Sequence, residues 1–249
     1  MSFPQFKSKY DRVALFSPSD YISYALEQGK ISAESKFPET VVLCYHSPLM
    51  QKILKDERFE RCEHIFIHQN KKWGIVGNFG IGAPVAAITM EDLIARGVKR
   101  FITFGYCGTL QTDLKIGDYI LIDKAIRDEG TSHHYLPSEK YSKASAEFVT
   151  YLENFLKEQK VKFKKGTTWT TDAIYRETID EIKAYQEEGV LGVDMEASAL
   201  FAVAKYRGVE CVGLFIVSDC LASGKDWKPH FHTAKDALYK LFEKLHLAF

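Results

Sequence analysis

The stretch Gly189-Val-Leu-Gly-Val-Asp-Met-Glu-Ala-Ser-Ala-Leu-Phe-Ala-Val-Ala-Lys-Tyr-Arg-Gly208 decides the fold of this chain. Its apolar run, residues 190–193, predicts a strand, and residues 197–207 carry apolar side chains on one side, as a helix does. Glu196 therefore stands where a strand gives way to a helix. Ligands bind at strand ends in α/β sheets, so this carboxylate is a candidate site residue. Its simpler interpretation is a favourable charge at a helix N-terminus.

A second acid, Asp219, follows the run Val212-Gly-Leu-Phe-Ile-Val217, which is apolar throughout. Such a run is typical of a strand covered on both faces. Taken alone, Asp219 could simply cap the next element. A glycine-rich segment, Val76-Gly-Asn-Phe-Gly-Ile-Gly-Ala-Pro84, lies earlier in the chain. Glycine-rich turns bind anions, but they also serve tight packing.

The remaining pattern alternates strands with helices and predicts one domain over residues 1–249. Strands are predicted at residues 12–16, 40–44, 72–76, 100–104, 118–122 and 211–217. Helices are predicted at residues 84–97, 144–160, 197–207 and 233–247. This alternation predicts an α/β fold with a mixed or parallel sheet wrapped by helices.

Charge and composition indicate a small-molecule partner. The chain of 249 residues has 33 basic and 33 acidic residues, so it lacks the basic excess of a surface for nucleic acid or an anionic membrane. Its apolar runs are too short for a membrane span, and its first residues lack a signal-like apolar core, which predicts a cytoplasmic protein. The five cysteines and the pairs His133-His134 and His230, His232 lack the spacing of a metal site, so no metal is expected.

The glycine-rich segment, Glu196 and Asp219, in this order, resemble the nucleoside phosphorylase family, which includes purine nucleoside phosphorylase, uridine phosphorylase and the adenosylhomocysteine nucleosidases. The resemblance covers most of the chain. It implies a central mixed β-sheet partly closed into a barrel, with helices on both sides. It also implies a homo-oligomer, a dimer or a hexamer, that binds a nucleoside and phosphate and uses no other cofactor.

The same resemblance implies roles for individual residues. Met195 and Glu196 match the family's pair that packs under the ribose and accepts hydrogen bonds from its hydroxyl groups. Asp219 matches the acid that donates a proton to N7 of a leaving purine, which favours purines over pyrimidines. Four further residues match positions that line the base or the sugar: Cys107, Gly108, Ile174 and Tyr175.

The phosphate site departs from the family pattern. Thr103 stands where phosphorylases carry an arginine, and Tyr106 replaces a small hydroxyl residue. Loss of guanidinium partners removes much of the binding of a phosphate ion. The remaining predicted phosphate contacts are Arg61, at the spacing of an arginine that the neighbouring subunit supplies, and backbone amides around Gly80.

The resemblance thus predicts phosphorolysis of purine nucleosides to free base and ribose 1-phosphate, with two alternatives. In the first, water replaces phosphate and Asp20 acts as the general base, as an acid after the first strand does in the nucleosidases. The simpler interpretation of Asp20 is helix capping. In the second, the chain binds nucleosides without turnover.

Overall fold

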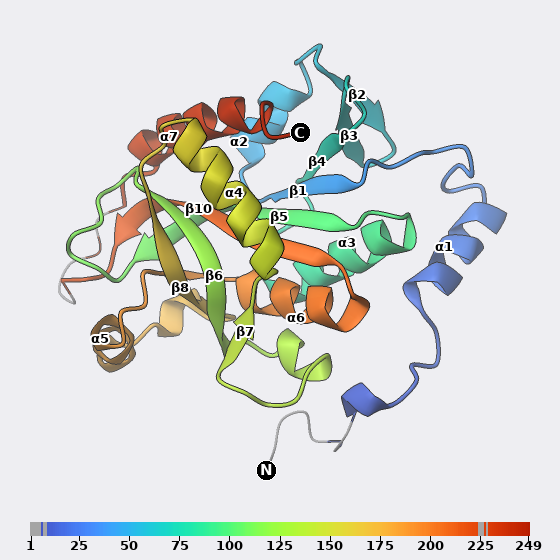
Figure 1. The fold of residues 1–249 in the computed structure, drawn as a ribbon. Coiled ribbons are helices and arrows are strands. Elements are labelled where there is room, and N and C mark those ends of the chain that lie inside the picture. Colours follow the sequence, from blue (N-terminus) through green and yellow to red (C-terminus); the bar gives the residue numbers. More distant parts are fainter. Residues whose placement is uncertain (1–5, 7–8, 224–226, 228) are drawn as a thin grey trace.

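The quoted stretch forms the junction of β9 (Gly192–Asp194) and α6 (Ala197–Arg207) in a computed structural model of the chain (Figure 1). The structure describes residues 6, 9–223, 227 and 229–249, so most of the N-terminal segment that was tested for a signal lies outside it. Every residue of α6 from 197 to 204 is buried, and the helix ends at Gly208 in the left-handed conformation that suits glycine. A helix buried on all sides lies in the interior, so the junction is central to the fold.

Ten strands of the described chain form one mixed sheet, and five of them close into a barrel. The closure arises because β10 pairs in parallel with β5 and antiparallel with β6. From β6 the barrel continues through β8 and β9 back to β5. The barrel strands other than β9 are β5 (Arg100–Thr109), β6 (Tyr119–Asp128), β8 (Phe163–Thr171) and β10 (Glu210–Cys220).

The sheet extends beyond the barrel from β5 through β1, β4, β3 and β2, while β7 pairs with β6. These strands are β1 (Thr40–Cys44), β2 (Phe59–Cys62), β3 (Ile65–His68), β4 (Trp73–Gly77) and β7 (Tyr141–Lys143). The prediction of a central mixed sheet partly closed into a barrel is therefore confirmed.

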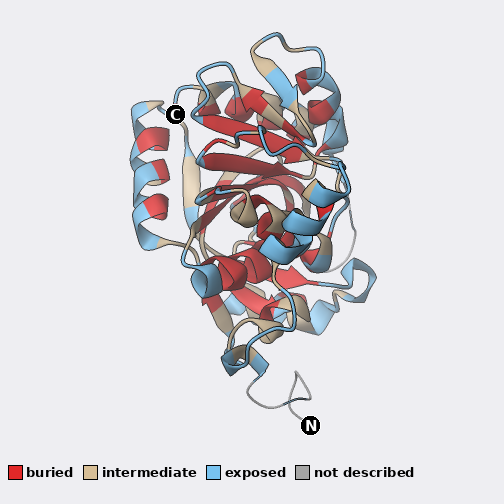
Figure 2. Cartoon of the chain, turned by 90° about the vertical axis from the view of Figure 1, so that its right-hand side faces the viewer, coloured by how far each residue is buried: buried red, intermediate tan, exposed pale blue. Residues whose placement is uncertain are grey.

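Helices cover both faces of the sheet, and most buried apolar side chains form two layers, with a third, smaller cluster around Trp169 (Figure 2). Along β1, Val41 and Leu43 join the layer under α3 and α6, while Val42 and Cys44 join the layer under α2, α4 and α7. Alternate residues of a strand point to opposite faces, which explains why this run is apolar at every position. The helices other than α6 are α1 (Pro18–Glu27), α2 (Ser47–Ile53), α3 (Ala83–Ala95), α4 (Ala146–Glu158), α5 (Ile179–Glu187) and α7 (Phe231–Leu245).

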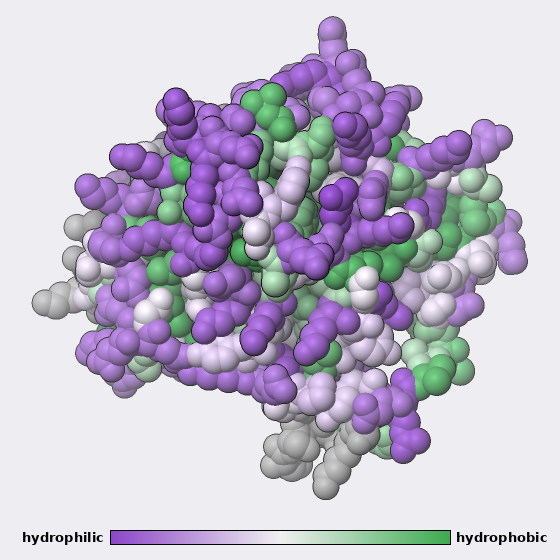
Figure 3. Space-filling view, viewed as in Figure 1, coloured by the Kyte–Doolittle hydropathy of each residue, from purple (hydrophilic) through white to green (hydrophobic). Residues whose placement is uncertain are grey.

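One predicted strand is wrong. Residues 12–16 form no strand but an extended connection between the short 3-10 helix η1 (Lys9–Asp11) and α1. Val13 and Leu15 are each 99% exposed, because no strand or helix of the described residues covers them. Figure 3 shows exposed apolar side chains over this connection, on a face that is otherwise mostly hydrophilic. The first strand of the sheet is β1, so the loop that follows the first strand begins at Tyr45.

The helix predictions are confirmed, that for α6 to the residue and those for α3, α4 and α7 with small shifts at the ends. The sequence pattern gave no signal for β2, β3, β7 and β8. The residues of β8, Phe-Lys-Lys-Gly-Thr-Thr-Trp-Thr-Thr, are polar at most positions, since threonine hydroxyls in this strand hydrogen-bond inside the barrel. Among the described helices, none combines the length and the apolar character that crossing a membrane requires.

Candidate functional site

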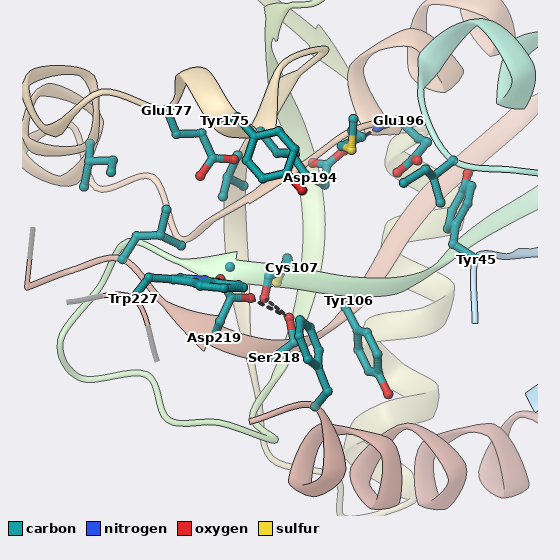
Figure 4. A pocket seen from close by; sticks show the side chains of 18 of the residues that line it. Tyr45, Tyr106, Cys107, Tyr175, Glu177, Asp194, Glu196, Ser218, Asp219 and Trp227 are labelled. Atoms are coloured by element: carbon teal, nitrogen blue, oxygen red, sulfur yellow. Dashed lines mark hydrogen bonds between the residues drawn. The ribbon is translucent and has the colours of Figure 1, made fainter. Parts of the chain in front are cut away.

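A cavity of about 730 Å³ opens beside the last residues of β5, β9 and β10 (Figure 4). This volume lies within the range of roughly 300–1,000 Å³ that is usual for small-molecule sites. The strands contribute Tyr106, Cys107 and Gly108 from β5, Val193 and Asp194 from β9, and Ser218 and Asp219 from β10. Loops, α5 and α7 supply the other lining residues: Tyr45, His46, Ile81, Ile174, Tyr175, Glu177, Ile179, Ile182, Met195, Glu196, Leu221, Trp227 and Phe231.

Asp194, not Glu196, caps α6. One carboxyl oxygen of Asp194 accepts hydrogen bonds from the backbone N–H groups of Glu196 (2.8 Å) and Ala197 (2.7 Å). Its other oxygen accepts from the hydroxyl of Thr168 at 2.7 Å. The Glu196 side chain makes no capping hydrogen bond, although Glu196 is the N-cap residue of α6. The Glu196 side chain therefore does not cap its own helix, and its carboxyl group lines the cavity.

The glycine-rich turn between β4 and α3 holds this carboxyl group. The backbone N–H of Gly82 donates to Oε1 of Glu196 at 2.6 Å. Gly82 and Gly80 both have φ of 104°, a conformation that other residues rarely adopt. Gly80, which was expected to bind phosphate, does not line the cavity, whereas the next residue, Ile81, does. The anion bound by the amide at the start of α3 is thus a side chain of the protein itself.

Burial and the neighbouring carboxylate of Asp194 raise the pKa of Glu196 to about 8. The N–H groups of Gly82 and Met195 oppose this shift, because they stabilise the ionised form. Glu196 consequently carries a proton over part of the neutral range. Hydroxyl groups that donate hydrogen bonds to Glu196 would favour its carboxylate.

Asp219 lies at the other end of the cavity, at the end of β10. Its Oδ1 accepts a hydrogen bond from the hydroxyl of Ser218 at 2.6 Å, and its Oδ2 accepts one from the indole Nε1 of Trp227 at 2.8 Å. The pairing of β10 with β5 shifts register between Val217 and Asp219, a bulge that re-aims the side chains at the strand end. Both carboxyl oxygens are thereby fixed in place beside the cavity.

The four residues expected around the base or sugar all line the cavity. Gly108 faces the side chains of Asp219 and Leu221, and a Cβ at this position would lie 2.4 Å from Cδ1 of Leu221 and 3.2 Å from Oδ2 of Asp219. A side chain at position 108 would therefore displace the side chain of Leu221. Ile174 is 42% exposed and Tyr175 is 94% exposed, so both lie at the rim, where a ligand would cover them. Cys107 is buried in the wall.

Two expected residues lie away from the cavity. Asp20 is in the first turn of α1, where its carboxylate accepts hydrogen bonds from the backbone N–H and the hydroxyl of Ser17, each at 2.7 Å. These bonds form a capping box in which Ser17 is the N-cap residue and Asp20 the third helical residue, so Asp20 supports the cap without being the N-cap and does not line the cavity. Arg61 is exposed on β2 and donates from Nε to the carbonyl oxygen of Glu63 at 2.9 Å.

The aromatic end of the cavity consists of Tyr45, His46, Tyr106 and Phe231, of which sequence reasoning identified only Tyr106, as a departure from the phosphate site. The ring of His46 lies 5.1 Å from that of Tyr106, which lies 6.2 Å from that of Phe231. Tyr45 and His46 directly follow the predicted strand 40–44, so a search for strand-end residues there would have found them. The search was misplaced because the run 12–16 was taken as the first strand. Phe231 comes from α7 and leaves no such signal.

The aromatic end carries no positive charge at neutral pH. His46 accepts a hydrogen bond from the backbone N–H of Leu49 at Nδ1 (3.1 Å), and burial lowers the pKa of His46 to about 4, with a smaller contribution from Lys235. Among the described residues, neither lysine nor arginine lines the cavity. Arg127, a possible substitute, is buried and donates to the hydroxyl of Ser132 (2.9 Å) and the carbonyl oxygen of Pro137 (2.6 Å).

No group of three His, Cys, Asp or Glu side chains in the described part of the chain is arranged to hold a metal ion. The cavity therefore offers Glu196 and Asp219 at opposite ends, two further acids, an apolar wall and hydrogen-bonding groups from the backbone. This combination suits a neutral, polar small molecule with hydroxyl groups at one end and ring nitrogens at the other.

The family model and the similar proteins all point to phosphorylases. A model of the phosphorylase superfamily matches residues 56–246. The chain is 31% identical over 145 residues to a guanosine phosphorylase of Halorubrum lacusprofundi, which covers 58% of this chain and 60% of that protein's length. It is 30% identical over 173 residues to a DeoD-type purine nucleoside phosphorylase of Buchnera aphidicola subsp. Schizaphis graminum, covering 66% of this chain and 72% of that protein.

Among solved structures, the chain is similar to uridine phosphorylase from Vibrio fischeri ES114 complexed with 6-hydroxy-1-naphthoic acid. The TM-score is 0.72 at 25% sequence identity, and the match covers 89% of this chain and 95% of that one. A second structure of uridine phosphorylase from the same organism matches with a TM-score of 0.70 at 26% identity, covering 88% of this chain and 95% of that one.

Proposed function

The chain belongs to the phosphorylase superfamily, and on this premise we propose that it cleaves the N-glycosidic bond of purine nucleosides. The observation that carries the proposal is the placement of Glu196 and Asp219 at opposite ends of one cavity (Figure 4). A nucleoside has hydroxyl groups on its sugar and nitrogens on its base, so it can contact both acids at once.

In this proposal the ribose lies at Met195 and Glu196. The carboxylate of Glu196 accepts hydrogen bonds from the ribose hydroxyls, which orients the ring and favours the positive charge that develops on the sugar as the bond to the base breaks. The N–H of Gly82 holds the carboxyl group in position before the ligand arrives. Ligand contacts fixed in advance are those that stabilise a transition state most.

The base lies between Asp219, the backbone at Cys107 and Gly108, and the rim residues Ile174 and Tyr175. Asp219 contacts the edge of the base and takes part in its protonation. Purines are favoured because an acid at this place can act at N7, and because two of the similar enzymes are a guanosine phosphorylase and a purine nucleoside phosphorylase. Ser218 and Trp227 support the carboxyl group of Asp219.

Phosphorolysis is the reaction that the family supports, and it needs an anion site. Arg61 does not line the cavity of its own chain. In this proposal it therefore contacts phosphate bound in the cavity of a second copy of the chain. Val13 and Leu15, exposed beside α1, offer apolar surface for the homo-oligomer, a dimer or hexamer, that this contact requires.

Hydrolysis is the second candidate, and one observation favours it. The described lining of the cavity has aromatic rings and no lysine or arginine at the end next to Glu196 (Figure 4). A phosphate ion there would lose its hydration without gaining a cationic partner, whereas water carries no such cost.

One experiment separates these reactions. Guanosine, inosine and adenosine are incubated with the protein, with and without phosphate, and free base, ribose and ribose 1-phosphate are separated. Ribose 1-phosphate formed only with phosphate supports phosphorolysis, and ribose formed without phosphate supports hydrolysis. Binding of nucleoside without either product would contradict cleavage as the function. The double variant Glu196→Gln, Asp219→Asn is the control for a contaminating enzyme.

A further inference from the structure

A third carboxyl group, that of Glu177, lines the cavity and has no role in the proposal above. Glu177 follows the short 3-10 helix η3 (Ile174–Arg176) and precedes α5. Figure 4 shows its carboxyl group on the side of the cavity opposite Asp219 and Trp227, pointing into the space between them. A base held at Asp219 would therefore lie within the space that both acids face.

The Glu177 side chain does not cap α5. The N-terminus of α5 is closed by a capping box in which the hydroxyl of Thr178 accepts from the N–H of Glu181 (3.3 Å), and Glu181 accepts from the N–H of Thr178 (3.1 Å). In the described part of the chain, no residue forms a hydrogen bond or ion pair with the Glu177 carboxyl group. Its carboxyl group is partly buried at the cavity without a structural partner.

The charged groups around Glu177 are both acidic. Asp219 on β10 and Glu181 on α5 face it, and no described cation offsets their charge. Burial, and then these two acids, raise the pKa of Glu177 to about 7. Asp219 differs, because each of its oxygens accepts a hydrogen bond from a neighbouring donor. The two acids at the base end are therefore unlike: one is suited to accept hydrogen bonds and the other to hold a proton near neutrality.

We propose that Glu177 is a further catalytic residue, which donates the proton that the departing base requires while Asp219 holds the base edge. As the C1′–N9 bond breaks, its electron pair moves onto the base. The proton of the Glu177 carboxyl group passes to a ring nitrogen, so the base leaves neutral and Glu177 becomes a carboxylate. The oxygen of water or phosphate forms the new bond to C1′, and its proton passes to solvent, from which Glu177 is protonated again.

This inference rests on the proposed cleavage of purine nucleosides. It adds to that proposal the identity of the residue that protonates the base. A donor whose pKa lies close to the working pH is the most effective general acid. Cleavage by the wild-type protein should accordingly fall as pH rises above about 7, since the donor is then lost. Purine substrates whose base must be protonated on departure should show this dependence.

The test compares two substrates that differ by a methyl group at N7 and therefore in their need for a proton. Guanosine needs a general acid, whereas 7-methylguanosine carries a positive charge on its base and leaves without one. In Glu177→Gln, we expect turnover of guanosine to fall by about 10²–10⁴-fold and its decline above pH 7 to disappear. Turnover of 7-methylguanosine should fall much less. Glu187→Gln, at the exposed C-terminal end of α5, is the matched control and should match wild type on both substrates.

Thermal unfolding of Glu177→Gln shows whether the variant is folded, and Glu177→Asp should restore part of the guanosine activity. Equal losses on both substrates in a folded Glu177→Gln variant would overturn the role as proton donor, as would unchanged guanosine turnover. A wild-type protein that cleaves neither substrate at any pH from 5 to 9 would instead overturn the proposed function, and the inference with it. The two failures are thus distinguishable.

Discussion

The N–H of Gly82 donates a 2.6 Å hydrogen bond to the carboxyl group of Glu196, so the start of α3 holds the side chain that begins α6. The two helices share one apolar layer, which fixes their ends relative to each other. A glycine at position 82 is required, because its φ of 104° is strained for any residue with a side chain. The glycine-rich turn therefore positions a carboxyl group of the protein, where the sequence indicated an external anion.

The first prediction concerns Glu196→Gln. We expect nucleoside binding to weaken about ten- to a hundredfold, because hydrogen bonds to a charged group contribute about 1.5–3 kcal/mol and a neutral amide forms weaker ones. Binding of the free base should stay nearly constant, since the base lies at Asp219. Calorimetric titration with guanosine and with guanine measures both, and Glu158→Gln on the exposed side of α4 is the control.

The pH dependence of this binding has a definite sign. Because burial raises the pKa of Glu196 to about 8, its carboxylate forms mainly above that pH in the empty site. Nucleoside affinity of wild type should rise as pH increases from 6 to 9, and Glu196→Gln should lose this rise. An equal loss of affinity for guanosine and guanine would contradict the ribose role of Glu196.

The second prediction concerns Asp219→Asn. An amide cannot accept hydrogen bonds at both positions, so either Ser218 or Trp227 loses its acceptor. Turnover of guanosine should fall by about 10²–10⁴-fold, as for loss of a group that assists proton transfer to the base. The thermal midpoint should change little because Asp219 lies at a strand end. Asp236→Asn, on the exposed side of α7, is the control, and unchanged kcat in Asp219→Asn would remove Asp219 from the mechanism.

Much of the fold could be predicted because its central strands and helices carry local signals. The run 40–44 and the helix 197–207 coincide with β1 and α6, since full burial on both sides makes each continuously apolar or nearly so. The run 12–16 has the same local character but lacks covering elements, and its side chains are exposed. Whether an apolar run becomes a buried strand or an exposed connection depends on tertiary contacts, which a local sequence pattern does not contain.

Residue patterns alone predicted the site only where it follows strand ends. Glu196 and Asp219 were found in this way, whereas Cys107 came from the family resemblance, and all three line the cavity. Glu177 and Trp227 come from loops whose residues are polar or isolated. These loops follow β8 and β10, which pair with opposite edges of β6 in the barrel. Loop residues of this kind have no period or spacing from which sequence reasoning could infer a shared site.

The third prediction concerns Asp20→Asn. Asp20 accepts two hydrogen bonds from Ser17 in the capping box of α1 and lies outside the cavity. Turnover should be unchanged in the presence and in the absence of phosphate, while the thermal midpoint should fall slightly through weaker capping. Steady-state kinetics and thermal unfolding check both statements, with Asp11→Asn as the exposed control. Loss of turnover at an unchanged thermal midpoint would contradict this prediction and would indicate that Asp20 acts in the cavity of a second copy of the chain.

The fourth prediction concerns acid stability. His246 packs against Trp73, Phe242 and His68, and neither of its ring nitrogens has a hydrogen-bond partner among the described residues. Burial, and then Arg58, lower the pKa of His246 to about 4. The unfolded chain therefore binds a proton at a higher pH than the folded chain. Stability should be constant above pH 6.5 and fall as pH decreases towards 4.

The expected loss is on the order of 1–2 kcal/mol, since each pKa unit corresponds to about 1.4 kcal/mol and solvent screens part of the effect. His246→Phe keeps an aromatic ring in the cluster but cannot be protonated, so its stability should fall less between pH 6.5 and 4. Urea unfolding at several pH values measures the difference, with His232→Gln as the exposed control. Parallel curves for wild type and His246→Phe would contradict the role of His246.

The last prediction concerns phosphate. Tyr45, His46 and Tyr106 present neutral groups at the end of the cavity next to Glu196, since the pKa of His46 is lowered to about 4. Phosphate should therefore bind at pH 7 with a dissociation constant in the millimolar range or weaker, which corresponds to at most about 4 kcal/mol. Any phosphate-dependent cleavage should require Arg61 from a second copy of the chain and disappear in Arg61→Ala, whereas Lys72→Ala, an exposed cation on a nearby turn, should leave it unchanged. Calorimetric titration with phosphate and product analysis measure both effects. Submillimolar affinity that survives Arg61→Ala would contradict this prediction and require a cation site that the described lining of the cavity lacks.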